Sequence, residues 1–255
     1  MKNGLFKKPE DDFWSNVDYK TIHTIMCSSP HVVTKLIREK EKEILLKYIK
    51  NAKRIIWLGI GFGEFSSELF QGLSTQQKRK LELIAVDINK KSQEFCQYNV
   101  YPHLNKTKFV NKDFKDYSTK FKNNDLLLLE FNTYNNLEEN TRKKVLKIIK
   151  QNTLGKTILT IFDPEYKKEH LRRYQWDASL GMSNLIKIEK RSPDFISFKF
   201  ERKKQRYFSN HKSQKQMEKE LTEAGINLNR IKIIKIPHAF IVVINGIKGK
   251  QSEFL

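Results

Sequence analysis

Three glycines at alternate positions, Gly59, Gly61 and Gly63, are the residues of this 255-residue chain that point most directly to chemistry. They follow a short apolar run and precede a stretch with helical periodicity, residues 64–73. Glycine lets the backbone bend sharply and approach a ligand closely, so the pattern indicates a strand that turns over a nucleotide-like ligand into a helix. The spacing is G-x-G-x-G, whereas a dinucleotide-binding turn would place its third glycine at Glu64.

Two carboxylates follow the next strand-like runs. Asp87 ends the run 83–87, where a carboxylate is placed to accept hydrogen bonds from both hydroxyls of a ribose. Asp113 follows the run 108–110, where a short acidic side chain could bond the exocyclic amine of adenine. The alternative is that each carboxylate only caps a helix or a turn.

These marks, in this order, resemble those of class I S-adenosylmethionine-dependent methyltransferases over about residues 32–245. The resemblance implies S-adenosylmethionine as the cofactor, and methyl transfer to a nitrogen or oxygen acceptor. It implies that five residues bind the cofactor: Gly59, Gly61, Gly63, Asp87 and Asp113.

One position departs from the family pattern. Members of the family usually carry Asp or Glu two residues before the first glycine, near the methionine end of the cofactor, and here that residue is Trp57. Glu64 offers a carboxylate nearby. The departure leaves open a second hypothesis, in which a catalytically degenerate methyltransferase fold acts as a binding or scaffold protein.

Strand-like and helix-like segments alternate along the chain, which is typical of βαβ units and a parallel sheet. With the resemblance, this predicts an α/β fold: a Rossmann-like, doubly wound, mostly parallel seven-stranded sheet with an antiparallel C-terminal hairpin. The expected strands are residues 55–59, 82–87, 107–111, 125–130, 157–162, 230–236 and 239–244. The expected helices are residues 32–50, 64–73, 90–100 and 137–151, and one that Ser213–Gln216 opens and Gly225 ends.

Three parts of the chain follow from this assignment. Residues 1–31 are expected to form an N-terminal cap, and residues 32–255 the methyltransferase domain. The segment 163–212 breaks the alternation, so we expect an insertion that serves as a substrate cap at the ligand end of the sheet. In the first helix, the charged stretch 38–43 alternates in sign and is interpreted as its solvated face.

Candidate acceptor-side residues lie after the fourth strand and in the insertion. Glu130 and Asn132 occupy the positions where methyltransferases place groups that face the methyl group and the acceptor. Glu130 is the first candidate for a catalytic general base and Asn132 for substrate binding. Tyr174, Trp176 and Asp177 are substrate-binding candidates that would wall a pocket for an amine or aromatic acceptor, although packing of the cap explains them equally well.

Two further resemblances are weaker. The Tyr-x-x-Asp pattern at Tyr174 and Asp177, with the charged first helix, is similar to amino-acid N-methyltransferases of the histidine type. Residues 163–166 (Asp-Pro-Glu-Tyr) resemble the Asp-Pro-Pro-Tyr motif of adenine-N6 methyltransferases, but the second proline is missing and the motif follows the wrong strand, so we reject this reading. His211 is expected to be a cap or surface residue.

The net charge of +20 is compatible with a nucleic-acid partner, because basic surfaces release counterions on binding phosphate backbones. The basic residues are scattered, however, and only residues 202–212 are dense. We therefore expect a small-molecule acceptor, with RNA as the alternative. Two cysteines and no apolar run of membrane-spanning length or secretion signal lead us to expect a cytoplasmic, reduced protein with no metal and no membrane partner.

Overall fold

The structure of the chain is a computed structural model that describes residues 31–170, 172, 186–192, 195–200 and 205–247. All but the last residue of the expected cap, 1–31, lie outside the described residues. None of the described helices is long and apolar enough to cross a membrane.

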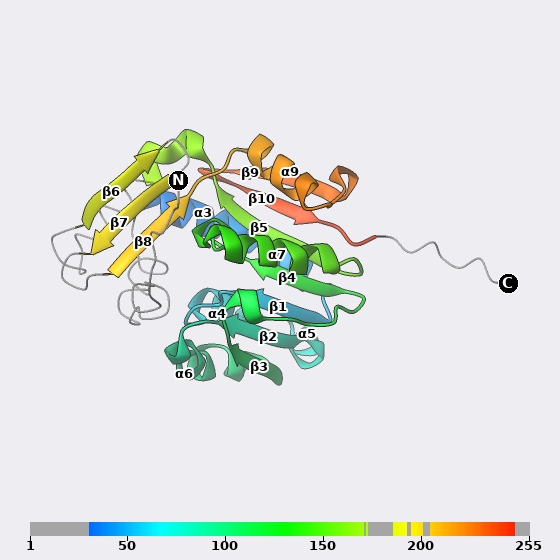
Figure 1. Cartoon of the computed structure of the whole chain (residues 1–255). Helices are drawn as coiled ribbons and strands as arrows, with labels where there is room; N and C mark the ends of the chain where they lie inside the picture. Colours follow the sequence, from blue (N-terminus) through cyan, green and yellow to red (C-terminus); the bar gives the residue numbers. More distant parts are fainter. Residues whose placement is uncertain (1–30, 171, 173–185, 193–194, 201–204, 248–255) are drawn as a thin grey trace.

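A seven-stranded sheet forms the centre of the structure (Figure 1), with the strand order β3-β2-β1-β4-β5-β10-β9. The strands are β1 (Arg54–Leu58), β2 (Glu82–Asp87), β3 (Lys106–Asn111), β4 (Asp125–Leu129), β5 (Lys156–Phe162), β9 (Ile231–Ile236) and β10 (Ala239–Ile244). The first five strands pair in parallel, and β10 pairs antiparallel with both β5 and β9. The prediction of a mostly parallel seven-stranded sheet that ends in an antiparallel hairpin is confirmed.

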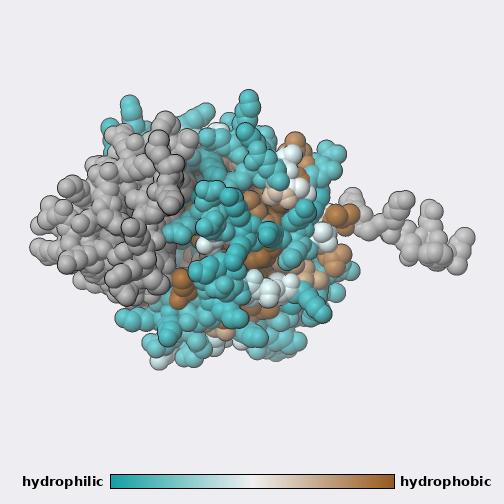
Figure 2. Space-filling model, viewed as in Figure 1, coloured by the Kyte–Doolittle hydropathy of each residue, from teal (hydrophilic) through white to brown (hydrophobic). Residues whose placement is uncertain are grey.

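Helices cover both faces of the sheet. They are α3 (Val32–Ile49), α4 (Glu64–Gln71), α5 (Thr75–Lys80), α6 (Lys90–Asn99), α7 (Glu139–Gln151) and α9 (Gln214–Glu223). Successive side chains of a strand point to opposite faces, so Ile55 and Trp57 of β1 pack with α3, α4 and α6, while Ile56 and Leu58 pack with α7 and α9. Hydrophilic residues cover most of the face seen in Figure 2, and hydrophobic residues show through in patches.

The insertion contains a second, smaller sheet. Its antiparallel strands are β6 (Ile186–Ser192), β7 (Phe195–Phe200) and β8 (Gln205–Asn210). Figure 1 shows this sheet, in yellow, beside the main one. The chain then returns through α9, which Ser213 and Gln216 open with a capping box as predicted. Gly225 follows the end of this helix with a φ of 82°.

The outer strands of the main sheet both carry exposed lysines. Lys106 and Lys108 are exposed on β3, and Lys232 and Lys235 are exposed on β9. The strands between these edges are paired on both sides, and β1, β4 and β10 are buried along their whole length.

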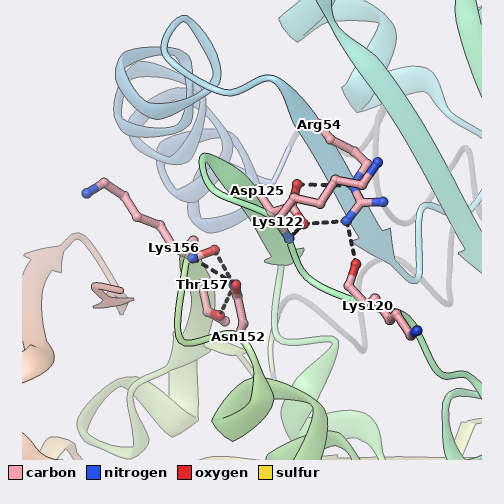
Figure 3. A network of polar contacts seen from close by, with 8 residues as sticks. Arg54, Lys120, Lys122, Asp125, Asn152, Lys156 and Thr157 are labelled. Carbon is pink, nitrogen blue, oxygen red and sulfur yellow. Dashed lines mark hydrogen bonds and ion pairs between the residues drawn. The ribbon is translucent and has the colours of Figure 1, made fainter. Parts of the chain in front are cut away.

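A buried ion pair fixes the amino ends of two neighbouring strands (Figure 3). Arg54 at the start of β1 contacts Asp125 at the start of β4 through two hydrogen bonds, Nη2–Oδ2 at 2.5 Å and Nε–Oδ1 at 3.0 Å. The Arg54 Nη2 also donates to the Lys120 carbonyl at 2.7 Å, and the backbone N–H of Lys122 donates to Asp125 at 2.6 Å. Every charge in this pair has a close partner, which is the condition for burying ions at little net cost.

Trp57 belongs to the core and is fully buried. Its ring packs edge-on against Phe70 of α4, with ring centroids 6.2 Å apart, and its strand neighbours are Ala85 and Leu128. The buried indole N–H has no hydrogen-bond partner among the described residues. The position therefore requires apolar volume, which is a physical reason why it carries no carboxylate.

We expect Trp57→Asp to unfold the protein, because it removes aromatic volume worth about 3–5 kcal/mol and buries an unpaired carboxylate. Trp57→Phe keeps an apolar ring and loses no hydrogen bond, so we expect a loss of about 1–3 kcal/mol in the free energy of unfolding. Urea denaturation followed by circular dichroism measures both. A Trp57→Asp variant as stable as the wild type would contradict the core assignment.

Candidate active site

The glycine turn after β1 has a backbone conformation that residues other than glycine rarely adopt. Gly59, Gly61 and Gly63 have φ values of 77°, 61° and 82°. Two of them are also closely packed, since a Cβ added to Gly59 would lie 2.8 Å from Thr133 Cγ2, and one added to Gly63 would lie 2.5 Å from Val100 Cγ2. Both the turn and its packing therefore require glycine.

Gly61 differs from its two neighbours. A Cβ added to this residue would meet no atom of the described residues within 4 Å. Among these residues, none therefore blocks the direct approach of a ligand to the main chain at the tip of the turn.

Asp87 ends β2 and holds the glycine turn. Its Oδ2 accepts a hydrogen bond from the Gly61 N–H at 2.8 Å, and its Oδ1 accepts one from the Asn89 N–H at 2.9 Å. An ionised carboxylate has about four acceptor sites, so these two bonds are compatible with further bonds to ligand hydroxyls. Asp87 is thus an anchor of the glycine turn.

Asp113 follows β3 and opens a short 3-10 helix, Phe114–Asp116. Its Oδ1 accepts from the Lys115 N–H at 3.0 Å and its Oδ2 lies 3.2 Å from the Lys115 Nζ. The ring of the next residue, Phe114, packs close to the glycine turn: its Cζ would lie 3.3 Å from a Cβ added to Gly59. The turn that carries Asp113 is therefore a direct neighbour of the glycine turn.

The sheet order places the candidate residues in a row. Parallel strands end at the same edge, and in the order β3-β2-β1-β4 these ends carry Asp113, Asp87, Gly59 and Glu130 in turn. Adjacent strands lie about 4.8 Å apart. The row suits an elongated ligand that lies across the carboxyl edge of the sheet.

Glu130 follows β4 and is buried. Its carboxylate accepts a hydrogen bond from Arg38 Nη1 of α3. Burial raises the pKa of Glu130 to about 8, the guanidinium of Arg38 opposes this rise, and the neighbouring Glu41 carboxylate adds to it. A carboxyl group with a pKa near neutrality is suited to accept a proton at physiological pH.

Arg38 and Glu41 were expected on a solvated face of α3, and the structure shows that this expectation is wrong. The Arg38 side chain is 12% exposed and that of Glu41 is fully buried. The guanidinium carbon of Arg38 lies 4.1 Å from the ring centroids of both Phe65 and Phe131, so the cation is held between two aromatic faces. The sequence did contain a signal that Glu41 is buried. Glu41 lies four residues after Ile37 and three and four residues before Ile44 and Leu45, so it falls inside the apolar stripe of the helix.

Glu41 ties α3 to the ends of two strands. Its Oε1 accepts from the Phe131 N–H at 2.9 Å and from the Thr160 hydroxyl of β5. Burial raises the pKa of Glu41, while Arg38 and these two donors oppose the rise. The helix is thereby fixed to the turn that carries Glu130.

Asn132 lies behind that turn and is fully buried. Phe131 and Asn132 have φ values of 44° and 65°, so the chain leaves β4 through two successive left-handed residues. The Asn132 Oδ1 accepts from the Phe162 N–H at 3.0 Å and from Asn135 Nδ2 at 3.0 Å. These bonds give Asn132 a supporting position, at which it holds the shape of the turn beside Glu130.

His211 was expected to be a cap or surface residue, but it is buried. It lies in an aromatic cluster at the end of β5, where His170 stacks on Phe162 at a centroid distance of 4.4 Å and His211 meets the His170 ring edge-on at 4.9 Å. Phe162 in turn meets Phe131 edge-on at 5.1 Å. A series of ring contacts therefore leads from the Glu130 turn into the insertion. Local sequence periodicity could not predict these contacts.

The candidate residues Tyr174, Trp176 and Asp177 lie outside the described residues. Within the described part of the chain, no group of three or more His, Cys, Asp or Glu side chains is placed to hold a metal ion.

No protein-family model matches the sequence, and no curated protein matches it significantly. Solved structures with similar folds include a protein from Pyrococcus horikoshii OT3, which has a TM-score of 0.62 and 20% sequence identity and covers 89% of this chain and 97% of its own. An S-adenosylmethionine-dependent methyltransferase from Clostridium acetobutylicum ATCC 824 has a TM-score of 0.55 and 12% identity, with coverage of 89% and 97%. The CcbJ methyltransferase from Streptomyces caelestis has a TM-score of 0.58 and 10% identity, with coverage of 94% and 99%.

A structure from Burkholderia thailandensis adds a bound ligand. This 1,6-didemethyltoxoflavin-N1-methyltransferase, with its substrate and S-adenosylhomocysteine bound, has a TM-score of 0.51 and 9% identity and covers 86% of this chain and 80% of its own. The likenesses extend over most of each chain at low identity. They show that the chain has the class I fold of S-adenosylmethionine-dependent methyltransferases.

Proposed function

We propose that this protein binds S-adenosylmethionine across the carboxyl edge of its main sheet and transfers the methyl group to a nitrogen or oxygen atom of a small molecule. The observation that carries the proposal is the row formed by Asp113, Asp87 and the glycine turn, in which the Gly61 backbone faces open space. The residues present fit the cofactor, because a side chain at Gly61 would fill the space that it needs.

Each part of the row has a role toward the cofactor. Asp87 accepts hydrogen bonds from the ribose hydroxyls, and Asp113 accepts one from the adenine amine. The glycine turn lets the main chain lie against the ligand between them and β4. The turn that carries Glu130 lies one strand further along the edge, where it would face the methyl-donor end of a ligand held by these residues.

The chemistry asked of the protein is mainly alignment. When bound, S-adenosylmethionine supplies an electrophilic methyl group on a positively charged sulfur. The protein must place the acceptor atom in line with that group and keep water away. Glu130 is buried, close to the edge and has a pKa of about 8, so we assign it the role of accepting the acceptor's proton.

The acceptor side is assigned to the insertion 163–212, which we propose caps the acceptor. The small sheet β6–β8 lies on the chain between β5 and α9, and the aromatic cluster at the end of β5 reaches the Glu130 turn through the contact of Phe162 with Phe131. The 1,6-didemethyltoxoflavin-N1-methyltransferase with a similar fold acts on a small molecule, which supports the same class of acceptor here.

We expect Asp87→Ala to weaken S-adenosylhomocysteine binding by about 30- to 1,000-fold, because two charge-assisted hydrogen bonds to one ribose are together worth about 2–4 kcal/mol. Calorimetric titration measures the loss. The control is Asp116→Ala, which removes an exposed carboxylate three residues after Asp113 and should leave the affinity unchanged. An Asp87→Ala variant that binds as tightly as the wild type would disprove the ribose assignment.

The glycine turn provides a matched pair of variants. Gly61→Ala adds a methyl group to open space, so we expect a folded protein with a strain of about 1–2 kcal/mol and an affinity for S-adenosylhomocysteine at least about tenfold lower. Gly63→Ala adds the same strain and a clash with Val100, so its melting temperature should fall further. Unchanged affinity in Gly61→Ala would mean that the ligand does not occupy the space at this residue.

The acceptor class can be tested with methyl-labelled S-adenosylmethionine and two pools, the small-molecule fraction of a cell extract and total RNA. We expect label in the small molecules, and a rate lower by about 10²- to 10⁴-fold for Glu130→Gln, the usual contribution of a general base. Label in RNA that is lost when Lys203, Lys204 and Arg206 are neutralised would assign RNA as the acceptor. Tight S-adenosylhomocysteine binding with no label in either pool would favour a scaffold.

A further inference from the structure

Among the described residues, the cluster at the α3–β4 junction contains two buried carboxyl groups, Glu41 and Glu130, and one cation, Arg38. Arg38 Nη1 lies 3.4 Å from Glu41 Oε2, and the same nitrogen donates to Glu130. The flat faces of the guanidinium are covered by Phe65 and Phe131. Two buried carboxyl groups therefore share one nitrogen of one cation, and aromatic rings cover the flat faces of that cation.

The surrounding charges do not remove the imbalance. A further acid that acts on the cluster is Glu68 of α4, whose charge also raises the pKa of Glu130. Glu68 is exposed and pairs with Lys42 at 3.2 Å. From β5, the group that faces the cluster is the neutral hydroxyl of Thr160. In the described part of the chain the cluster thus has one carboxyl group more than it has buried cations, and Glu130 is the one that directly follows β4.

The glycine turn lies next to this cluster. Thr133 packs against Gly59, and the Thr133 N–H donates to the Glu130 carbonyl at 2.9 Å. Glu130 follows β4, which is the next strand after β1 in the row that holds the cofactor. A charge at the methyl-donor end of the cofactor would therefore act on Glu130 through protein of low polarity, where Coulomb interactions are strong.

We propose that Glu130, held by Arg38 and Glu41, is the counter-charge for a cationic group of the bound cofactor and releases its proton when the cofactor binds. This inference rests on the proposed function. Two groups have the required chemistry: the sulfonium, which S-adenosylmethionine has and S-adenosylhomocysteine lacks, and the α-ammonium, which both have. Arg38 and Glu41 are positioning residues, since they act through Glu130.

In the proposed cycle, the proton that Glu130 loses on cofactor binding is replaced by the acceptor's proton. Glu130 loses its proton to solvent as the cationic cofactor binds. In the transfer step the acceptor atom bonds to the methyl carbon, the C–S bond breaks with its electron pair passing to sulfur, and the acceptor's proton passes to the Glu130 carboxylate. The sulfur is then neutral, Glu130 is protonated, and the attraction between the site and the product cofactor is lost.

The test is calorimetric titration of the full chain with both cofactor forms between pH 6.5 and 8.5, in two buffers of different ionisation enthalpy. Below a pKa of about 8 the cation must displace a proton, so affinity for S-adenosylmethionine should rise with pH, by about 25-fold over this range, which corresponds to about 1.9 kcal/mol. Close to one proton should be released per molecule bound at pH 7. If the sulfonium is the cation, S-adenosylhomocysteine should show little of either effect; if the α-ammonium is, both ligands should show them equally.

Glu130→Gln should abolish both the pH dependence and the proton release, because the amide cannot titrate in this range. Glu43→Gln is the matched control: Glu43 lies on the same helix, two residues from Glu41, but is exposed and pairs with Lys40 and Lys47. Its pH dependence should equal that of the wild type. If Glu130→Gln does not fold, the comparison of buffers on the wild-type protein still decides.

The possible failures are separate. If neither ligand binds at any pH, the proposed function is wrong. If both ligands bind with affinities that do not change with pH and no proton is released, the cofactor assignment stands and the counter-charge role of Glu130 is overturned. Proton release that persists unchanged in a folded Glu130→Gln variant overturns it as well.

Discussion

The carboxyl edge of the main sheet depends on one carboxylate that α3 carries into the interior. A buried charge is costly unless it is bonded, so Glu41 must keep its contacts with the Phe131 N–H and the Thr160 hydroxyl. Those contacts fix α3 to the ends of β4 and β5 at the same time. The positions of Arg38 and of the Glu130 carboxylate follow, and with them one wall of the candidate site.

Buried charges are paired differently at the amino and carboxyl ends of the sheet. At the amino end, Arg54 and Asp125 form a one-to-one pair, and the backbone supplies further partners for both. At the carboxyl end, two glutamates share Arg38, and the pKa of Glu130 is raised to about 8. A fully paired charge holds strands together, whereas an incompletely paired charge remains able to exchange a proton or attract a ligand, which is why shifted pKa values gather at functional sites.

Local sequence patterns were sufficient to predict much of this structure. The glycine spacing placed the turn, alternation placed the strands, and Asp87 lies at the end of β2 as expected. The α3 charges were misread because their partners are remote in sequence: Glu41 bonds to residues 90 and 119 positions away. His211 was misread for the same reason, since its neighbours Phe162 and His170 lie about 40 to 50 residues earlier in the sequence. Whether a polar residue is buried or exposed depends on contacts with segments that are distant in sequence. The periodicity of a single helix carries no information about those contacts.

The exposed lysines on β3 and β9 bear on how this protein stays apart from its own copies. An outer strand presents unpaired backbone groups, and a second sheet can add to it and begin a fibrous aggregate. Lys106 and Lys108 line one rim of the sheet, and Lys232 and Lys235 line the other, so two copies that approach rim to rim meet like charges at both. Part of the strong positive charge of the chain thus disfavours edge-to-edge pairing of two copies, an effect that requires no partner molecule.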